Sequence, residues 1–384
     1  MKKITIQFTE KIIWFLFPWT ILILLLSSCR LFENNSQIED VEVLEITKWK
    51  DGYKSAYSPT YDTGLPSVND IENQWLIERG LFIDYEVVSH TYDQSPGRVS
   101  YMLEELIPNG FGYFGHGHKH DNHDELGYEA AKESFTTNFL SMKSYGLHPV
   151  SYAYPYGTAF KPETRQALKE SGFLSGRLFQ PEFEGYGPYI VPGDETVPPD
   201  WFALPSIRME DIEFQGRTQA VNNPSELIEH LEENIKLGSW LISTYHGIGY
   251  DGETNGRPVG WGFYKRENFY TEMLYVKEKY EQGKIWLASM DDVTLYIQQR
   301  NNATYSLEKV DENNYRLFFD NGLDNDRFRM PLTLRIRIDP VFIGSDITFS
   351  TPEDEQIYQT VIESEELLIN LHPFGIYYHI SIDD

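Results

Sequence analysis

The segment FGHGHKHDNHDEL, residues 114–126, contains four of the chain's ten histidines: His116, His118, His120 and His123. Imidazole is the commonest metal ligand because a neutral ring nitrogen is available near pH 7. His116 and His120 are four residues apart, a spacing that puts both rings on one face of a helix, and in a loop it still lets both reach one ion. The segment therefore indicates either a metal site or a solvated loop that happens to be rich in histidine.

Three other segments carry groups that could act beside a metal ion. SPTYDTG, residues 58–64, ends a β-compatible run at Asp62, where α/β barrels commonly place catalytic groups, although Asp-x-Gly is also an ordinary turn. SYAYPYG, residues 151–157, would end a strand in a rigid turn whose backbone N–H groups can stabilise an oxyanion. WLISTYHGIG, residues 240–249, delivers His246 to the loop side of a sheet, where a general acid can reach a leaving group.

The elements that would position these groups alternate between helical and strand patterns from about residue 49 to residue 300. Periodic apolar residues, each run followed by a glycine, predict helices over residues 128–144, 226–237 and 267–280. Candidate strands lie at residues 150–154, 239–245 and 284–288. Such alternation is typical of α/β proteins, and it predicts a barrel or an open α/β sheet.

The pattern changes after residue 300. YRLFFDNG, LTLRIRIDP and YYHISID alternate apolar and polar residues at period two, with turns at Asn321-Gly322 and at Pro340. Residues 301–384 are therefore predicted to form a small antiparallel β domain.

The first residues predict an export signal rather than an element of the fold. Lys2 and Lys3 precede an apolar run over residues 12–26, which ends at Leu-Ser-Ser-Cys with Cys29. This arrangement resembles a bacterial lipoprotein signal peptide, residues 1–29, with cleavage before Cys29 and a lipid on its thiol. The alternatives are an ordinary signal peptide and an uncleaved anchor. We expect a membrane-anchored lipoprotein of the cell envelope that faces the periplasm or the exterior.

Residues 30–48 are polar and acidic at first, which is typical of a flexible tether leading into the first strand. No later apolar run reaches the roughly 20 residues that a membrane-spanning helix needs. The chain has a formal net charge of −27, which repels phosphate backbones and argues against a nucleic acid partner. Cys29 is its only cysteine, so no disulfide can form within the chain and a core must hold the fold.

The four motifs, in this order, resemble those of the polysaccharide deacetylase family, carbohydrate esterase family 4, whose domain is also called the NodB-homology domain. PTYDTG resembles the first motif, usually Thr-Phe-Asp-Asp-Gly, and HGHKH resembles the metal motif with its two histidines. AYPYG is similar to the third motif and STYHGIG to the last. The closing segment KIWLASMDDVTLYIQQR also resembles the end of that domain. The resemblance covers about residues 49–300 and does not extend to residues 301–384.

The resemblance implies a distorted (β/α)7 TIM-like barrel, followed here by a small antiparallel β-sandwich-like domain. It implies a metal-dependent hydrolase that removes acetyl groups from N- or O-acetylated polysaccharide, with a divalent metal, Zn²⁺ being the expected ion. The implied roles are metal ligands for His116 and His120, general base for Asp62, oxyanion donor for the backbone N–H of Tyr156 and general acid for His246. Pro155 of the third motif is a candidate substrate contact. Trp261, in the Gly-rich segment GRPVGWGF after His246, is a second candidate because its ring could stack on a sugar.

Two positions depart from the family pattern. Thr63 stands where the family has a second Asp that binds the metal, and a neutral hydroxyl is a poorer ligand for a dication than a carboxylate. A third ligand could instead come from His118, His123, Asp121 or Asp124. Ala153 replaces an Arg of the third motif that would orient the base Asp through a charged hydrogen bond. Arg177, in SGRLF, is a candidate substitute, the alternative being an ordinary surface arginine.

Three functions stay open at this point. The first is a carbohydrate deacetylase or esterase. The second is a deacetylase-like glycan-binding envelope lipoprotein that has lost turnover through Thr63. The third is a structural envelope lipoprotein whose histidines store metal.

Overall fold

The computed structural model describes residues 40–62, 70–179, 187–210, 221–249, 262–353 and 355–383. The predicted signal peptide with Cys29, most of the predicted tether, Thr63 and Trp261 lie outside these ranges. In the ranges described, no helix combines the length and the apolar character that crossing a membrane requires.

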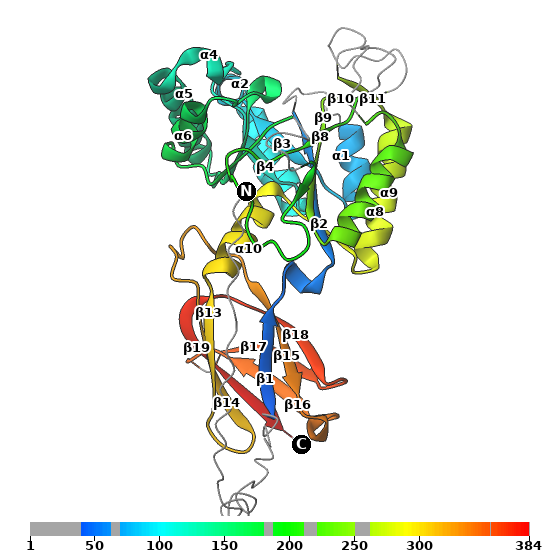
Figure 1. Cartoon of the computed structure of the whole chain (residues 1–384), viewed down its shortest axis with the longest axis vertical. Coiled ribbons are helices and arrows are strands. Elements are labelled where there is room, and N and C mark those ends of the chain that lie inside the picture. The colour runs from blue at the N-terminus through cyan, green and yellow to red at the C-terminus, as the bar shows by residue number, and fades with distance from the viewer. Residues whose placement is uncertain are drawn as a thin grey trace, which may run out of the picture. The chain divides into compact units, whose positions relative to one another are not determined.

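A ring of short parallel strands forms the first part of the fold (Figure 1). Its strands are β2 (Ser55–Tyr61), β3 (Asp84–Val87), β4 (Tyr113–Gly115), β5 (Ser151–Ala153), β6 (Ser175–Arg177), β8 (Ile207–Arg208) and β9 (Trp240–Tyr245). Each strand from β2 to β6 pairs in parallel with the next, β9 pairs with β2, and β8 pairs with β9. A parallel bridge between Arg177 and Leu204 closes the ring. The predicted distorted α/β barrel is therefore confirmed.

Short strands extend this sheet. β7 (Tyr189–Ile190) pairs antiparallel with β9, and β12 (Ile285–Leu287) pairs in parallel with β2. A separate two-stranded sheet joins β10 (Gly247–Gly249) to β11 (Phe263–Lys265). The predicted strands at residues 150–154, 239–245 and 284–288 correspond to β5, β9 and β12, and they are confirmed.

Helices follow most of the barrel strands. The longer ones are α1 (Asp70–Ile77), α5 (Tyr128–Ser144), α6 (Pro162–Glu170), α8 (Pro224–Leu237), α9 (Arg266–Glu281) and α10 (Met290–Asn302). The shorter helical segments are η1 (Lys50–Gly52), α2 (Ser89–Asp93), α3 (Pro96–Tyr101), η2 (Met102–Leu106), η3 (Ile107–Asn109), α4 (His123–Leu126), η4 (Pro155–Gly157) and η6 (Pro340–Phe342). The helices predicted over residues 128–144, 226–237 and 267–280 are confirmed as α5, α8 and α9.

Helix α8 shows why the sequence signals were informative. The Asn223 side chain accepts a hydrogen bond from the backbone N–H of Glu226, and Pro224 occupies the first turn, where its missing N–H is not needed. The helix ends at Gly238, whose φ of +61° is a left-handed conformation that glycine adopts without strain. Helices α8 and α9 pack against each other on one flank of the parallel sheet (Figure 1).

Aromatic residues fill the barrel core. Tyr57, Tyr61, Tyr152, Tyr154 and Tyr245 are each at most 1% exposed, and they pack with leucine, isoleucine and phenylalanine side chains. Much of the chain's aromatic content is thus structural, so aromatic composition alone does not indicate a sugar-binding surface.

Two antiparallel sheets form the second part of the fold. One has the order β1-β15-β18 and the other the order β13-β14-β19-β16-β17. Their bounds are β1 (Val41–Ile46), β13 (Thr304–Lys309), β14 (Asn314–Asp320), β15 (Leu332–Ile338), β16 (Asp346–Ser350), β17 (Gln356–Val361), β18 (Glu366–Leu371) and β19 (Phe374–Asp383). Side chains from both sheets share one core, and this core continues to Tyr296 of α10 and Trp240 of β9. The antiparallel β architecture predicted after residue 300 is confirmed.

The predicted tether over residues 30–48 was wrong in its last part. Residues 41–46 form β1, which pairs antiparallel with β15, so a strand that precedes the barrel in sequence completes a sheet that follows it. Val41 and Val43 are buried, whereas Leu44 is 36% exposed. The acidic residues between the valines suggested a solvated tether, but the alternation of valine with glutamate is the pattern of a strand with one buried face.

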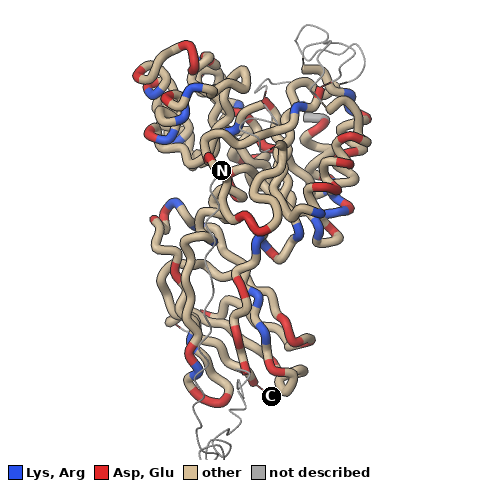
Figure 2. The backbone as a smooth tube through the Cα atoms, in the orientation of Figure 1, with Lys and Arg blue, Asp and Glu red and all other residues tan. Residues whose placement is uncertain are grey.

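Charged residues cover both parts of the fold. Asp and Glu are distributed over the barrel and over the antiparallel sheets (Figure 2). Several take part in exposed ion pairs, among them Arg335 with Glu45 and Glu366, and Lys279 with Glu232. Exposed pairs of this kind contribute little to stability, so they are consistent with an acidic, well-hydrated surface.

The assignment of β1 can be tested by substitution. Val41→Ala should lower the free energy of unfolding by about 1–3 kcal/mol, because it removes two buried methyl groups from the shared core. Leu44→Ala, on the exposed side of the same strand, should change it by about 0.5 kcal/mol or less. Urea denaturation of both variants measures the difference. Equal effects at the two positions would contradict the assignment of residues 41–46 as a strand with one buried face.

Candidate active site

The carboxyl ends of the barrel strands meet at one rim. Tyr61 of β2 pairs with Tyr85 of β3 and with Tyr245 of β9, so the residues that follow in each strand, Asp62, Glu86 and His246, reach the same level. The Asp62 backbone N–H donates to the Tyr245 carbonyl at 2.9 Å. Barrels of parallel strands place their active sites at this rim.

His116 and Arg177 reach the rim from two further strands. The His116 backbone N–H, just after β4, donates to the Val87 carbonyl of β3 at 3.1 Å, and Arg177 of β6 is in register with Ala153 of β5. The topology thus brings together Asp62, His116, Arg177 and His246, which are far apart in the sequence.

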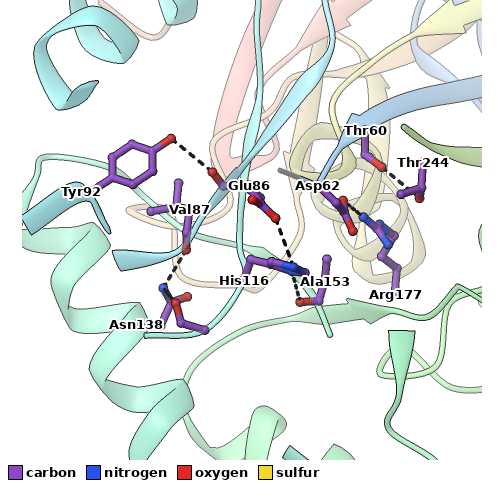
Figure 3. Close-up of polar contacts among 11 residues, drawn as sticks. Thr60, Asp62, Glu86, Val87, Tyr92, His116, Asn138, Ala153, Arg177 and Thr244 are labelled. Atoms are coloured by element: carbon purple, nitrogen blue, oxygen red, sulfur yellow. Dashed lines mark hydrogen bonds and ion pairs between the residues drawn. The ribbon is translucent and has the colours of Figure 1, made fainter. Parts of the chain in front are cut away.

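Asp62 and Arg177 form a buried ion pair. Nη2 of Arg177 donates to Oδ1 of Asp62, and their side chains are both 0% exposed (Figure 3). The guanidinium carbon lies 5.4 Å from the centroid of the Phe114 ring and 5.2 Å from that of Phe179. The sequence suggested Arg177 as a substitute for the arginine that is missing at Ala153. Its contact with Asp62 is the one expected of such a substitute. Among the described residues Oδ2 of Asp62 has no hydrogen-bond partner, which leaves this oxygen for a water or a substrate.

The two ring nitrogens of His116 have different surroundings. Its Nδ1 lies 2.8 Å from the Ala153 carbonyl oxygen, and because a carbonyl can only accept, Nδ1 must be the protonated nitrogen (Figure 3). Metal-binding histidines commonly hold their second nitrogen in this way, which orients the ring. Burial, with His120 and Arg177 adding to it, holds the pKa of His116 well below its usual value. The ring is therefore neutral and Nε2 is available as a ligand.

His120 and Tyr156 lie next to each other on two loops at the rim. The centroid of the His120 ring is 4.8 Å from that of His116 and 4.9 Å from that of Tyr156. His120 has a φ of +61° and Tyr156 a φ of +62°, values that are uncommon for residues other than glycine. Such left-handed residues cost of order 1–3 kcal/mol and cluster at functional sites. Pro155, before Tyr156, is buried in η4.

The other candidates for a third ligand have contacts of their own. His123 stacks on Phe135 with ring centroids 4.1 Å apart, and its Nε2 lies 3.1 Å from Oγ of Ser134. Nδ1 of His118 lies 3.0 Å from Oγ of Ser89. The remaining two are acidic: Asp124 accepts hydrogen bonds from the Phe160 backbone and the Thr164 hydroxyl at the start of α6, and Asp121 is half-buried in the same loop.

A carboxylate that sequence reasoning missed touches His116 instead. Oε2 of Glu86 lies 3.1 Å from Nε2 of His116, and Glu86 is 2% exposed (Figure 3). The available signal was FIDYEVV, residues 82–88, in which Asp84 and Glu86 alternate with large apolar residues. All four residues of β3 are buried, so neither acidic side chain is on a solvated face.

His246 is buried beside Phe179 and Gly262. It is 5% exposed, and its ring centroid is 5.1 Å from that of Phe179. A Cβ added at Gly262, whose φ is +63°, would lie 2.6 Å from Cβ of His246, so this position requires glycine. The Gly262 backbone N–H donates to Oε1 of Glu210 at 3.1 Å. Trp261, predicted on the substrate side of this loop, lies outside the described residues, as does Thr63.

The donor types at the rim suit a divalent ion, since imidazole and carboxylate both bind Zn²⁺. In the part of the chain that the structure describes, no group of three or more His, Cys, Asp and Glu side chains already has the arrangement of a metal site. His116 contacts Glu86, and the His120 ring lies beside the His116 ring, so the types of residue present fit a divalent ion.

Comparison with known proteins gives low similarity to several carbohydrate-active proteins. No family model matches the chain. A curated relative, a gellan lyase from Bacillus sp., is 21% identical over 310 residues, which cover 79% of this chain and 12% of that protein. The chain therefore spans about an eighth of the length of the curated relative it matches.

Solved structures of similar proteins include carbohydrate esterases of family 4. A Mycobacterium smegmatis protein assigned as a polysaccharide deacetylase is 16% identical with a TM-score of 0.42, over 68% of this chain and 96% of that one. A family 4 carbohydrate esterase from Streptomyces lividans in complex with acetate is 12% identical with a TM-score of 0.38. The match covers 61% of this chain and 91% of that one. A family 4 pseudoenzyme from Bacillus anthracis is 11% identical with a TM-score of 0.36. The match covers 62% of this chain and 65% of that one. Identities and TM-scores this low carry no argument about activity.

The ion pair between Asp62 and Arg177 should be strongly coupled. Arg177→Met should lower the free energy of unfolding by about 3–5 kcal/mol, because it leaves a buried carboxylate without its partner. Adding Asp62→Asn to Arg177→Met should recover part of that loss. The double variant should therefore be more stable than the sum of the two single effects predicts. A double-mutant cycle by urea denaturation measures the coupling, and strictly additive effects would contradict it.

His123 should make the fold sensitive to acid. Burial, with a smaller effect of His120, lowers the pKa of His123 from 6.5 to about 3. Between these values the unfolded chain binds a proton that the folded chain does not, so the free energy of unfolding falls as the pH drops below 6.5. His123→Gln should remove about 1.4 kcal/mol per pH unit from this slope. Chemical denaturation at a series of pH values measures this slope. If the free energy of unfolding depends on pH in the same way for His123→Gln and for the unaltered protein, His123 is not the group responsible.

Proposed function

We propose that this protein is a metal-dependent hydrolase that removes acetyl groups from a polysaccharide. One observation carries the proposal: the buried Asp62–Arg177 pair and His116, with Nδ1 fixed by the Ala153 carbonyl, meet at the carboxyl rim of one barrel. Their motifs occur in the order that the resemblance to polysaccharide deacetylases requires. Both N- and O-acetyl groups are candidate substrates.

The proposed roles follow from the contacts. A divalent ion, expected to be Zn²⁺, held by His116 and His120, would supply Lewis acidity and a water of lowered pKa. Asp62 would take the proton from the water oxygen as that oxygen attacks the acetyl carbonyl carbon, while Arg177 holds the carboxylate in position. His246 would give a proton to the leaving amine or alcohol as its bond to the acetyl carbon breaks. Acetate and the free sugar group are the products.

The charge that develops on the carbonyl oxygen needs a donor. The backbone N–H of Tyr156 is the proposed one, in the turn that follows β5 and beside the His120 ring. Losing a single donor of this kind typically slows acyl transfer by ~10²–10³. Pro155 of the same turn and Trp261 would contact the sugar.

We also propose that the chain works at the cell envelope, held to the lipid bilayer through a lipid on Cys29. The support is the pattern of residues 1–29, which ends in the chain's only cysteine. An acetylated polysaccharide of the envelope or its surroundings would then be within reach of the tethered barrel.

A second function is favoured by one observation. Thr63 occupies the position of a usual ligand, and a neutral hydroxyl is a poorer ligand for a dication than a carboxylate. A deacetylase-like protein that binds glycan without turnover would be the result. The two functions differ in bound metal and in acetate release.

Acetate release from chitin oligomers, peptidoglycan and acetylated xylan, measured together with the metal content, separates these functions. The enzyme should bind about one Zn²⁺ per chain and release acetate, and His116→Ala with His120→Ala should abolish both. Asp62→Asn should lower turnover by about 10²–10⁴ while the metal remains, since the base is not a ligand. Asp346→Asn, at an exposed position of β16, is the matched control.

Circular dichroism must show that each variant is folded at the assay temperature, because Asp62→Asn disrupts a buried ion pair. Full turnover in folded Asp62→Asn would refute the role of Asp62. Glycan binding without acetate release in the unaltered protein would favour the second function.

A further inference from the structure

We propose that Glu86 is the carboxylate ligand of the divalent ion and takes the place that Thr63 leaves open. The inference rests on the proposed function and names a ligand that neither the motifs nor the resemblance assigns. It makes the donor set His116, His120 and Glu86, drawn from β3 and from the loop that follows the neighbouring strand β4.

The distance between the two donors supports joint coordination. Oε2 of Glu86 and Nε2 of His116 are 3.1 Å apart. Two ligand atoms that each lie ~2.0–2.2 Å from a tetrahedral ion are separated from each other by roughly 3.3–3.5 Å. A shift of a few tenths of an ångström would therefore admit an ion between them.

The tautomer of His116 explains why this pair needs a cation. Nδ1 carries a proton toward the Ala153 carbonyl, so the other ring nitrogen, Nε2, is the one that faces the carboxylate oxygen. Two acceptors at this distance repel each other unless a proton or a metal ion lies between them. A metal ion satisfies both at once, and it also attracts the neighbouring His120 ring.

The other charges at the rim leave this role to Glu86. Arg177 neutralises Asp62 in a contact where both side chains are fully buried. His123 and His118 contact Ser134 and Ser89, and Asp124 accepts a hydrogen bond from the Thr164 hydroxyl of α6. Among the described residues, buried Glu86 places a carboxylate oxygen against a ring nitrogen of His116.

The strand order gives Glu86 this position. Glu86 is in register with Phe114 of β4, two residues before His116, and it follows Tyr85, the partner of Tyr61, which precedes Asp62. The carboxylate of β3 is thus inserted between the strand that carries the proposed base and the strand that carries the first histidine.

Metal titration of the full chain tests this inference without an activity assay. Zn²⁺ affinity is measured by competition with a chromophoric chelator for the unaltered protein, for Glu86→Gln and for the control Glu272→Gln. Glu272 is also buried, and its carboxylate accepts hydrogen bonds from Tyr245 and Tyr264. Loss of a mere supporting residue around a ligand weakens metal binding about 10–100-fold. Glu86→Gln should therefore weaken Zn²⁺ binding by about 100-fold or more, while Glu272→Gln should not change it.

A second variant keeps the inference testable if Glu86→Gln does not fold. Glu86→His replaces an oxygen donor by a nitrogen donor, so the protein should still bind Co²⁺ but with a changed visible absorption spectrum, which reports the kind and number of ligands. A residue that only supports His116 would leave that spectrum unchanged.

These outcomes distinguish a failure of the role of Glu86 from a failure of the proposed deacetylase function. Equal Zn²⁺ affinity of Glu86→Gln and the unaltered protein, or an unchanged Co²⁺ spectrum of Glu86→His, would overturn the role of Glu86 and leave the proposed deacetylase intact. An unaltered protein that binds neither Zn²⁺ nor Co²⁺ would overturn both.

Discussion

The parallel pairing of β2 with β3 on one side and with β9 on the other determines where every group of the candidate site lies. This register aligns Asp62, Glu86 and His246 at the carboxyl ends of three strands, and the next pairing adds His116. A slip of one residue in β3 would turn Glu86 away from His116, because successive strand side chains point to opposite faces. The chemistry proposed here is thus a consequence of strand register.

Charge compensation is the second constraint. The rim holds an arginine, two carboxylates and three histidines, and Asp62, Glu86, His116 and Arg177 are each at most 3% exposed. An isolated buried charge is unfavourable, so each must have a partner. Arg177 contacts Asp62, and the carboxylate of Glu86 contacts Nε2 of His116. A divalent ion bound by Glu86 and His116 would be the source of reactivity.

Sequence reasoning succeeded where local signals decide the structure. The helix predicted over residues 128–144 has those bounds as α5, because apolar spacing and a following glycine specify a helix locally. The contact of Arg177 with Asp62 could be suggested because Ala153 stands where the motif pattern has an arginine, so another arginine was sought for the base. β1 was missed because its partner β15 is almost 300 residues away along the chain and its glutamates resemble a solvated segment. Glu86 was missed because motif analysis looked at loops, whereas the informative residue lies within a buried strand. The sequence could not distinguish the four histidines of residues 114–126, since their different surroundings come from Ser89, Ser134, Phe135 and Ala153, all outside that segment.

The most direct test of the central claim is a crystal structure of the protein grown with Zn²⁺, with anomalous diffraction data collected at the zinc absorption edge. The account predicts one anomalous peak at the barrel rim, ~2.0–2.2 Å from Nε2 of His116 and from a carboxylate oxygen of Glu86, with His120 turned toward it. Absence of a peak at this rim, or zinc bound at exposed histidines with Glu86 and His116 still in direct contact, would contradict it.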